Sequence, residues 1–436
     1  MPQSFTIILG KAVRYAARLR GGGSALPGLF VERISPSFVP DTLAQLPRGV
    51  VIISGTNGKT TTTKMVVALL ESQGLKVFTN RTGSNFVRGV AAALLGEIDM
   101  KGKLNADIAV LELDEAHAVK FVEVIPPHYS LLLNVMRDQL DRFGEIDATA
   151  RMLEKIAAAT TKTVVMNRED ARIRAIAPRL PKSADVRYFG LVDRLLSRFP
   201  NDDELHQIEI KKKPAKGSTK TTSRTTVAKD AADVTLKDFN EKGAAFTIGK
   251  KDFVTPLKLK GVYNIYNSAA ALALVRAIVP EASVNSLLGA LSTVTPAFGR
   301  GETLSVGGHP LELVLVKNPA GFRLGLESYD PDGYATMIAI NDNYADGRDM
   351  SWLWDVDFTK LVDHPVYAAG VRAYDMALRL QYDEVGMEKV ETNLSKALAE
   401  FIELHPNTPK RIYCTYTAML ALRKELAKIT RVEVVS

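Results

Sequence analysis

The sequence predicts an α/β protein with two domains, each built on a largely parallel sheet. Short β-branched runs alternate with helical stretches from Gly49 onward, and this alternation is typical of a parallel sheet with helices on its faces. The strand-like runs are apolar throughout rather than at every second position, as expected for strands buried on both faces. The chain has 436 residues, which is too long for one ordinary core and indicates more than one domain.

The chain begins with a lead-in, residues 1–44, in which residues 5–20 read as a basic amphipathic helix. We expect this helix to pack on its own domain, and contact with an anionic membrane surface remains the alternative. A central parallel-sheet domain is expected over residues 45–298. Its predicted elements are strands at 50–53, 76–78, 108–113, 129–133, 164–166 and 244–248, and helices over 59–73 and from Asn264.

A hydrophilic insertion is expected at about residues 200–235, inside the central domain. It is rich in Lys, Ser and Thr and has no aromatic residue to stack on bases, so we interpret it as a solvated loop rather than a nucleic-acid-binding segment. Beyond it, a smaller Rossmann-like α/β domain is expected over residues 299–436. Its predicted strands are 311–316, 335–340, 366–369 and 411–413.

Composition limits the cellular setting more than the activity. The formal net charge of +7 and the pI of about 9.2 suit an anionic partner without choosing its class. The single cysteine, Cys414, excludes an internal disulfide and a cysteine-based zinc site, and it fits a reducing cytoplasm. No apolar run reaches the roughly 18 residues of a membrane span. We therefore expect a cytoplasmic protein, with a peripheral contact at the inner face of the membrane left open.

The strongest functional signal follows the first predicted strand. The run 50–53 leads through a glycine-containing loop into a helical stretch, an arrangement that points free backbone amides at phosphate oxygens. We expect Lys59 to contact the β- and γ-phosphates of ATP and Thr60 to bind Mg²⁺. Ile53 stands where the usual pattern has glycine, so the loop is a shortened variant. The expected ATP-binding residues here are Gly55, Thr56, Asn57, Gly58, Lys59, Thr60 and Thr61.

A second magnesium ligand is expected on a neighbouring strand. Glu112 ends the apolar run 108–113 and would lie at the same sheet edge as the loop. An exposed carboxylate beyond a strand is the weaker interpretation, because Glu112 falls inside the apolar run. For Asp114 and Glu115, capping of the next helix is the alternative.

With these residues in place, the chain resembles the Mur ligases, which activate a carboxylate as an acyl phosphate and join it to an amine. The segment 166–170 is similar to a family segment that lines the nucleotide site, and 261–267 to one that approaches the adenine. The segment 299–302 is similar to the family's domain-junction segment. Tyr263 and Gln139 each stand where the family pattern has a histidine. The histidine that Gln139 replaces helps to hold a second metal ion in many relatives, so the sequence does not decide whether a second metal ion binds here. The resemblance adds Asn167, Asp170, Asn264, Asn267 and Arg300 to the expected ATP site.

The C-terminal segment narrows the resemblance to the MurT family, the synthetase subunits of lipid II isoglutaminyl synthase. The runs 317–321 and 342–358 carry this similarity. Many members hold a four-cysteine zinc ribbon in the middle domain. Here the Lys- and Thr-rich insertion stands in its place, so no zinc is expected.

The resemblance implies an ATP- and Mg²⁺-dependent amidation of the D-glutamate α-carboxylate in the lipid II stem peptide. Lys59 and Arg300 would neutralise charge on the transferred phosphoryl group. Ammonia would come from a GatD-type glutaminase in a heterodimer, because Cys414 lies in a strand-like run and is expected to be a core thiol. Asp349 would orient the partner's catalytic histidine, and capping of a local turn is its alternative role.

Three other functions stay open at this stage. An amino-acid-adding Mur ligase or folylpolyglutamate synthase-like enzyme would use an amino acid in place of ammonia. A non-catalytic scaffold would keep the nucleotide fold without turnover, and a nucleic-acid-stimulated ATPase would use the basic insertion. The intact Lys59, Thr60 and Glu112 argue against the scaffold.

Overall fold

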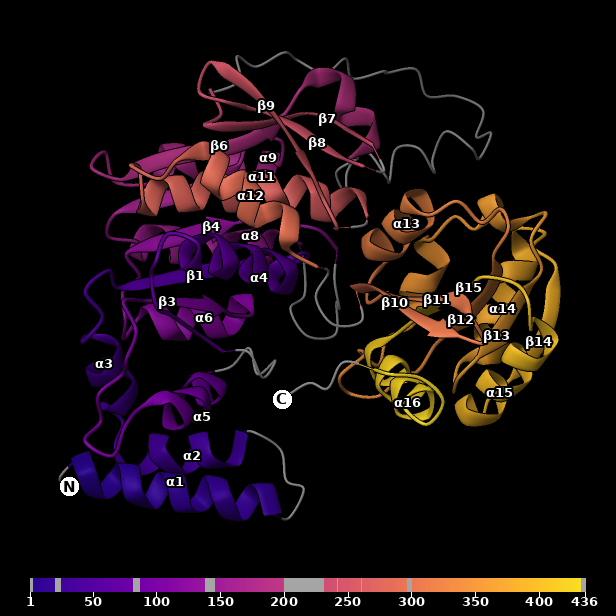
Figure 1. The fold of residues 1–436 in the computed structure, drawn as a ribbon, viewed down its shortest axis with the longest axis horizontal. Helices are drawn as coiled ribbons and strands as arrows, with labels where there is room; N and C mark the ends of the chain where they lie inside the picture. Colours follow the sequence, from indigo (N-terminus) through magenta and orange to yellow (C-terminus); the bar gives the residue numbers. More distant parts are fainter. Residues whose placement is uncertain are drawn as a thin grey trace. The chain divides into compact units, whose positions relative to one another are not determined.

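The computed structural model describes residues 3–19, 25–80, 87–137, 146–199, 231–240, 242–259, 261–295 and 300–432. The chain divides into two units (Figure 1). The larger unit comprises Met1–Val135, Asp147–Lys258 and Asn264–Val294, and the smaller one Met136–Ile146, Leu259–Tyr263 and Thr295–Ser436. The N-terminal lead-in therefore belongs to the same unit as the phosphate loop.

The larger unit is organised around a nine-stranded sheet in the order β2-β3-β1-β4-β5-β6-β7-β8-β9. From β2 to β7 all neighbours pair in parallel, whereas β8 and β9 continue the sheet in antiparallel pairs. The strands are β1 (Val50–Ser54), β2 (Val77–Thr79), β3 (Ile108–Glu112), β4 (Tyr129–Leu132), β5 (Thr163–Asn167), β6 (Asp185–Leu191), β7 (Val234–Asn240), β8 (Gly243–Ile248) and β9 (Lys251–Pro256).

Every residue of β1, β3, β4 and β5 is buried, which explains why these strands are mostly apolar rather than alternating. β7 begins at Val234, inside the end of the expected insertion, and residues 200–230 lie outside the described part of the chain. The helices that accompany this sheet are α4 (Lys59–Glu71), α5 (Val87–Glu97), α6 (Glu115–Val122), α8 (Ile146–Ala159), α9 (Ala171–Arg174), α11 (Val262–Ile278) and α12 (Val284–Thr293).

Three N-terminal helices, α1 (Gln3–Leu19), α2 (Ala25–Ile34) and α3 (Phe38–Leu43), precede the first strand. α1 and α2 pack beside α5 (Figure 1). Ile7 is buried in this packing, and Lys11 Nζ donates a hydrogen bond to the carbonyl of Ile98 at 2.6 Å. The amphipathic α1 thus uses one face to pack on its own unit. Within the described residues, no helix has the length and apolar character needed to cross a membrane.

The smaller unit contains a six-stranded sheet in the order β10-β11-β15-β12-β13-β14, parallel except for the β10–β11 pair. Two apolar cores lie on its opposite faces, one built with α13 and α14 and the other with α15 and α16. The elements are β10 (Arg300–Val306), β11 (His309–Leu315), α13 (Pro319–Ser328), β12 (Ala335–Ala339), β13 (Val366–Ala369), α14 (Ala373–Tyr382), β14 (Met387–Glu391), α15 (Leu394–Leu404), β15 (Lys410–Cys414) and α16 (Tyr416–Leu426). The predicted α/β fold with a central and a smaller Rossmann-like sheet is confirmed.

Candidate active site

The phosphate loop connects β1 to α4, and glycine is required at two of its positions. Gly55 and Gly58 have φ angles of 132° and 90°, which side chains other than glycine rarely adopt. A Cβ on Gly58 would lie 2.1 Å from Nδ2 of Asn267. A Cβ on Gly55 would lie 2.9 Å from the backbone nitrogen of Asn134. The loop is therefore held close to α11 and to the end of β4, and α4 begins directly after it at Lys59.

Lys59 is buried and its ammonium group has several acceptors. Its Nζ donates to the carbonyl of Gly55 at 2.7 Å and lies 3.3 Å from carboxylate oxygens of both Asp114 and Glu115. Asp114 is the N-cap residue of α6 but makes no side-chain capping bond. Asp114 therefore occupies the N-cap position without a side-chain capping bond, and the carboxylates of Asp114 and Glu115 both pair with the loop lysine.

Thr60 and Glu112 are brought together as the magnesium prediction requires. Thr60 Oγ1 donates to Glu112 Oε1 at 2.7 Å, because β3 pairs with β1 in a register that places Glu112 opposite Ile53. Asn80 fixes the backbone of Glu112 on the other side, donating to its carbonyl at 2.8 Å and accepting from its amide at 3.0 Å. A hydroxyl and a carboxylate are the hard oxygen donors that Mg²⁺ prefers, so these residues fit the ion.

Asn267 provides an independent sign that a ligand belongs beside the loop. Its side chain is 2% exposed, and its Nδ2 has no hydrogen-bond partner among the described residues. A buried amide nitrogen without an acceptor costs free energy, which an anionic or polar ligand next to Gly58 would offset. Asn264, three residues earlier, shares this side of α11 and is only partly buried.

Asn167 and Asp170 lie near the loop but are committed to hydrogen bonds within the protein. Asn167 donates to the carbonyl of Leu133 at 2.8 Å and accepts from the Tyr266 hydroxyl at 2.7 Å. Asp170 caps α9 and accepts from the backbone nitrogen of Val135 at 2.7 Å. Burial raises the pKa of Asp170 despite these donors. Their predicted contact with ATP stays a prediction, and the bonds seen here fix the chain after β4.

Asn134 is a site residue that sequence reasoning missed. Its Oδ1 accepts from the backbone nitrogen of Asn57 at 2.8 Å, and its Nδ2 donates to the Asn57 carbonyl at 2.9 Å. Its own carbonyl accepts from the nitrogen of Thr56 at 3.0 Å. Asn134 therefore holds the loop backbone in shape. The sequence feature that could have identified it is a single asparagine just after an apolar strand. Asn80, which follows β2, shows the same feature.

Two predicted features concern other parts of the chain. Arg300 opens β10 in the smaller unit, so its action on the phosphoryl group stays a prediction. Gln139 lies outside the described residues.

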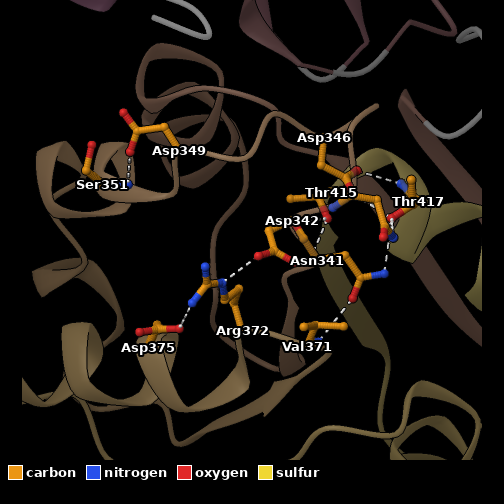
Figure 2. Close-up of polar contacts among 11 residues, drawn as sticks. Asn341, Asp342, Asp346, Asp349, Ser351, Val371, Arg372, Asp375, Thr415 and Thr417 are labelled. Atoms are coloured by element: carbon orange, nitrogen blue, oxygen red, sulfur yellow. Dashed lines mark hydrogen bonds and ion pairs between the residues drawn. The ribbon is translucent and has the colours of Figure 1, made fainter. Parts of the chain in front are cut away.

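The second predicted site, around Asp349, lies at the carboxyl end of the smaller sheet. Buried Asp346 accepts hydrogen bonds from the backbone nitrogen of Thr417 at 2.7 Å and from its hydroxyl at 2.5 Å (Figure 2). Asn341 donates to the same hydroxyl at 3.1 Å. These bonds join the segment after β12 to the start of α16. The loop that carries Asp349 is thereby anchored at both the sheet and a helix.

Asp349 itself is exposed and accepts from the backbone nitrogen of Ser351 at 2.9 Å (Figure 2). Hydrogen bonds from the Ser351 hydroxyl and amide hold the pKa of Asp349 below its ordinary value. The local turn-capping role is therefore present. The hydrogen bonds from Ser351 leave the Asp349 carboxylate ionised and exposed to solvent. It can therefore still accept a hydrogen bond from another protein.

A glycine loop between a parallel strand and a helix, with lysine, threonine and glutamate at one sheet edge, is typical of a nucleotide-binding domain. Residues 53–198 match the Mur ligase middle domain. Residues 315–419 match the MurT ligase C-terminal domain. The chain belongs to the MurT family of Mur ligases, as the resemblance predicted.

The similar curated proteins agree over nearly the whole chain. Subunit MurT of the glutamine-hydrolysing lipid II isoglutaminyl synthase of Streptococcus pneumoniae is 30% identical, covering 97% of this chain and 96% of that protein. The corresponding subunit of Staphylococcus aureus is 28% identical, covering 92% and 93%.

Solved structures share the fold at lower identity. MurF of Acinetobacter baumannii superposes with a TM-score of 0.67 at 18% identity, covering 92% of this chain and 80% of that one. MurF of Thermotoga maritima in complex with ADP gives 0.65 at 17% identity, covering 90% and 84%.

Proposed function

We propose that this chain is the ATP-dependent synthetase subunit of a lipid II isoglutaminyl synthase, converting the D-glutamate α-carboxylate of the stem peptide to an amide. The observation that carries the proposal is the full-length similarity to MurT subunits together with a complete Lys59, Thr60 and Glu112 arrangement. The intact arrangement of Lys59, Thr60 and Glu112 argues against a scaffold that binds the nucleotide without turnover.

In the proposed reaction the substrate carboxylate attacks the γ-phosphorus of ATP, giving an acyl phosphate and ADP. Ammonia then attacks the acyl carbon, loses a proton and displaces inorganic phosphate, leaving the amide. Lys59 would bind the phosphate oxygens after exchanging its contacts with Asp114 and Glu115, and Arg300 would add a second positive charge. Thr60 and Glu112 would hold Mg²⁺, which neutralises charge on the transferred phosphoryl group.

The ammonia source is proposed to be a separate GatD-type glutaminase subunit. Glutamine hydrolysis of this kind needs a reactive cysteine, and the only cysteine of the chain, Cys414, is fully buried in β15. Burial raises the pKa of the Cys414 thiol, which disfavours the nucleophilic thiolate. The names of the similar proteins describe a subunit of a glutamine-hydrolysing enzyme. This supports the assignment of amide synthesis and glutamine hydrolysis to separate subunits.

The test combines the purified chain with ATP, Mg²⁺ and lipid II, and follows the product by mass spectrometry. One reaction receives ammonium, and another receives glutamine with the glutaminase subunit. We expect amidation in both, and none with glutamine when the partner is omitted. Transfer of an added amino acid in place of ammonia would support the amino-acid ligase alternative instead.

Asp349 is proposed to act across the subunit interface by orienting the partner's catalytic histidine. Its exposure and ionised state support this role. Asp349→Asn is expected to keep ATP binding and to abolish glutamine-dependent amidation. Asp363→Asn, which changes another exposed carboxylate of the same unit, serves as the matched control. Normal glutamine turnover in the Asp349→Asn complex would rule out the role.

A further inference from the structure

The first strand of the smaller sheet contains an extra residue at its start. In the pairing of β10 with β11, Arg300 lies opposite Val314. Glu302 lies opposite Leu313, the residue adjacent to Val314 on β11. Gly301 therefore has no partner position and forms a β-bulge, and its φ angle of 86° is one that other residues rarely adopt. Bulges of this kind commonly redirect a neighbouring side chain beside an active site.

The bulge decides on which face of the sheet the Arg300 position lies. Leu313 belongs to the apolar core built with α15 and α16, and Val314 belongs to the core on the opposite face. Residues paired across two strands share a face. The pairing therefore assigns the Glu302 position to the face of Leu313, and the Arg300 position to the other face. In an unbroken strand, residues 300 and 302 would lie on the same face.

Backbone pairing alone gives the bulge little support. β10 lies at the edge of the six-stranded sheet that the structure describes, beside β11, and the bulge interrupts this ladder at the first residues of the strand. The buried side chains of Leu304 and Val306 fix the register farther along β10. Strand ends without such contacts open readily, so the backbone at Arg300 needs another anchor.

An ion pair with α16 supplies this anchor. The carboxylate of Glu302 pairs with the guanidinium of Arg423, and the two side chains are only 13% and 5% exposed. α16 packs on the face to which the pairing assigns Glu302, so the contact and the register agree. Because both groups are largely buried, opening the pair would deprive each charge of this counter-ion, which keeps the pair closed.

A tyrosine closes the space beside the bulge. A Cβ on Gly301 would lie 2.7 Å from the hydroxyl oxygen of Tyr329. The guanidinium of Arg411 lies 4.8 Å from the Tyr329 ring centroid and forms a buried ion pair with Glu312 at 2.9 Å. Tyr329 is thus held in place, and the backbone at Gly301 is confined between this tyrosine and the anchored Glu302.

We propose that Glu302, through its ion pair with Arg423, is a positioning residue for Arg300, an inference that rests on the proposed function. The proposed role of Arg300 is to neutralise charge on the transferred phosphoryl group, and such a contact is sensitive to a displacement of about 1 Å. Glu302 and Arg423 neutralise each other. Their role is to fix the backbone from which the Arg300 side chain extends, whereas a purely stabilising ion pair is the alternative.

Glu302→Gln in the full-length chain tests this role in the ammonium-driven amidation of lipid II. We expect kcat to fall about 100-fold and the KM for ATP to stay unchanged, because a displaced Arg300 loses a contact made in the transition state. Glu302→Gln/Arg423→Met leaves no unpaired charge, so it should regain stability in denaturant unfolding but not kcat. Asp383→Asn is the matched control, since it breaks the largely buried Arg379–Asp383 ion pair of the same unit and should keep kcat.

Two glycines of the β10–β11 hairpin test the bulge independently of charge. Gly301→Ala should lower kcat about 100-fold, because the added methyl group meets Tyr329 and displaces the backbone at Arg300. Gly308→Ala is its control, since Gly308 has a similar φ angle of 82° but no described atom within 4 Å of its added Cβ. Equal kcat values for the two variants would overturn the role of the bulge.

Dependence on Arg300 separates positioning from simple stabilisation. In an Arg300→Ala background, Glu302→Gln should cause no further fall in kcat, because the group that it positions is gone. An equal fall in both backgrounds would overturn the inference, and so would a normal kcat of Glu302→Gln alone. Failure of the unmodified chain to amidate lipid II with ammonium would instead reject the proposed function.

Discussion

At the scale of single residues, Lys59 shows how the charge of a buried ammonium group is neutralised when no nucleotide is bound. Its ammonium group is 3.3 Å from both the Asp114 and Glu115 carboxylates, so a buried cation is balanced by two anions. Phosphate oxygens would replace these acceptors on binding. The two carboxylates thus preserve the stability of the free loop and keep the lysine in position.

Lys59→Met separates these two roles. We expect ATP-dependent turnover to fall about 100- to 1,000-fold, because one charged contact to the transferred phosphoryl group is lost. We also expect a loss of about 3 kcal/mol of stability, because Glu115 is left buried without its cation. The double variant Lys59→Met/Glu115→Gln should regain stability but not turnover. Turnover near the normal value in either variant would remove Lys59 from the catalytic step.

The residues of the phosphate loop were predictable because a short, contiguous motif encodes them. Glu112 was also predictable, since it interrupts an apolar strand at the correct edge. The loop's supports were not, because Asn134 and Asn80 act through contacts between segments distant in the sequence. The same holds for the pairing of Lys59 with two carboxylates, which depends on where α6 begins.

Asp346 makes the stability of the loop that carries Asp349 depend on pH. Burial is the largest cause and raises the pKa of Asp346, while its hydrogen bonds from Thr417 and Asn343 lower it. Since the folded-state pKa lies above the ordinary value of 3.8, the carboxyl group's stabilising contribution is present below pH 3.8 and is lost as pH rises through the raised pKa.

Asp346→Asn removes this titrating carboxyl group. The contribution of Asp346 is therefore the difference in the free energy of unfolding between the unmodified chain and the variant, measured by urea unfolding at several pH values. The stability of the unmodified chain relative to the variant is expected to decrease from below pH 3.8 toward neutrality. A difference that stays constant or increases with pH would contradict the assignment.

At the scale of elements, the sequence predicted β1 to β5, β8, β11 to β13 and β15, whereas β6, β7, β9, β10 and β14 were missed. β1, β3, β4 and β5 are buried on both faces, so their sequences are mostly apolar rather than alternating. β9 and β14 form sheet edges and carry charged residues, which removes the apolar signal. The helices α2 and α3 were also missed, because their buried positions are set by packing against α5 rather than by a long periodic pattern.

The contact between α2 and α5 depends on one glycine. A Cβ at Gly28 would lie 1.9 Å from the backbone carbonyl oxygen of Arg88, so Gly28→Ala must push the two helices apart. We expect this overpacking to cost about 1–3 kcal/mol in thermal or denaturant unfolding. Gly289→Ala is the control, because nothing lies within 4 Å of its added Cβ in the exposed part of α12. It should stabilise the helix by about 0.5–1 kcal/mol. Equal effects of the two changes would disprove the close contact.

At the scale of the whole molecule, the two units carry different parts of the proposed reaction. The larger unit holds the phosphate loop with Thr60 and Glu112, the residues proposed to bind Mg²⁺, whereas the smaller one holds the Asp349 loop. Neither unit contains an accessible thiol, since the only cysteine of the sequence, Cys414, is buried. This supports the proposal that the nucleophile for glutamine hydrolysis belongs to a separate subunit.

Selective alkylation tests this division. The chain is treated with iodoacetamide in its native state, freed of reagent, and mixed with untreated glutaminase, ATP, Mg²⁺, glutamine and lipid II. Full activity is expected, because Cys414 is 0% exposed and burial raises the pKa of its thiol, so little thiolate is available. Treating the glutaminase instead should abolish glutamine-dependent amidation and leave the ammonium-driven reaction intact. Inactivation of the complex after alkylation of this chain alone would place a reactive thiol in β15 and would remove the main reason for assigning glutamine hydrolysis to a partner.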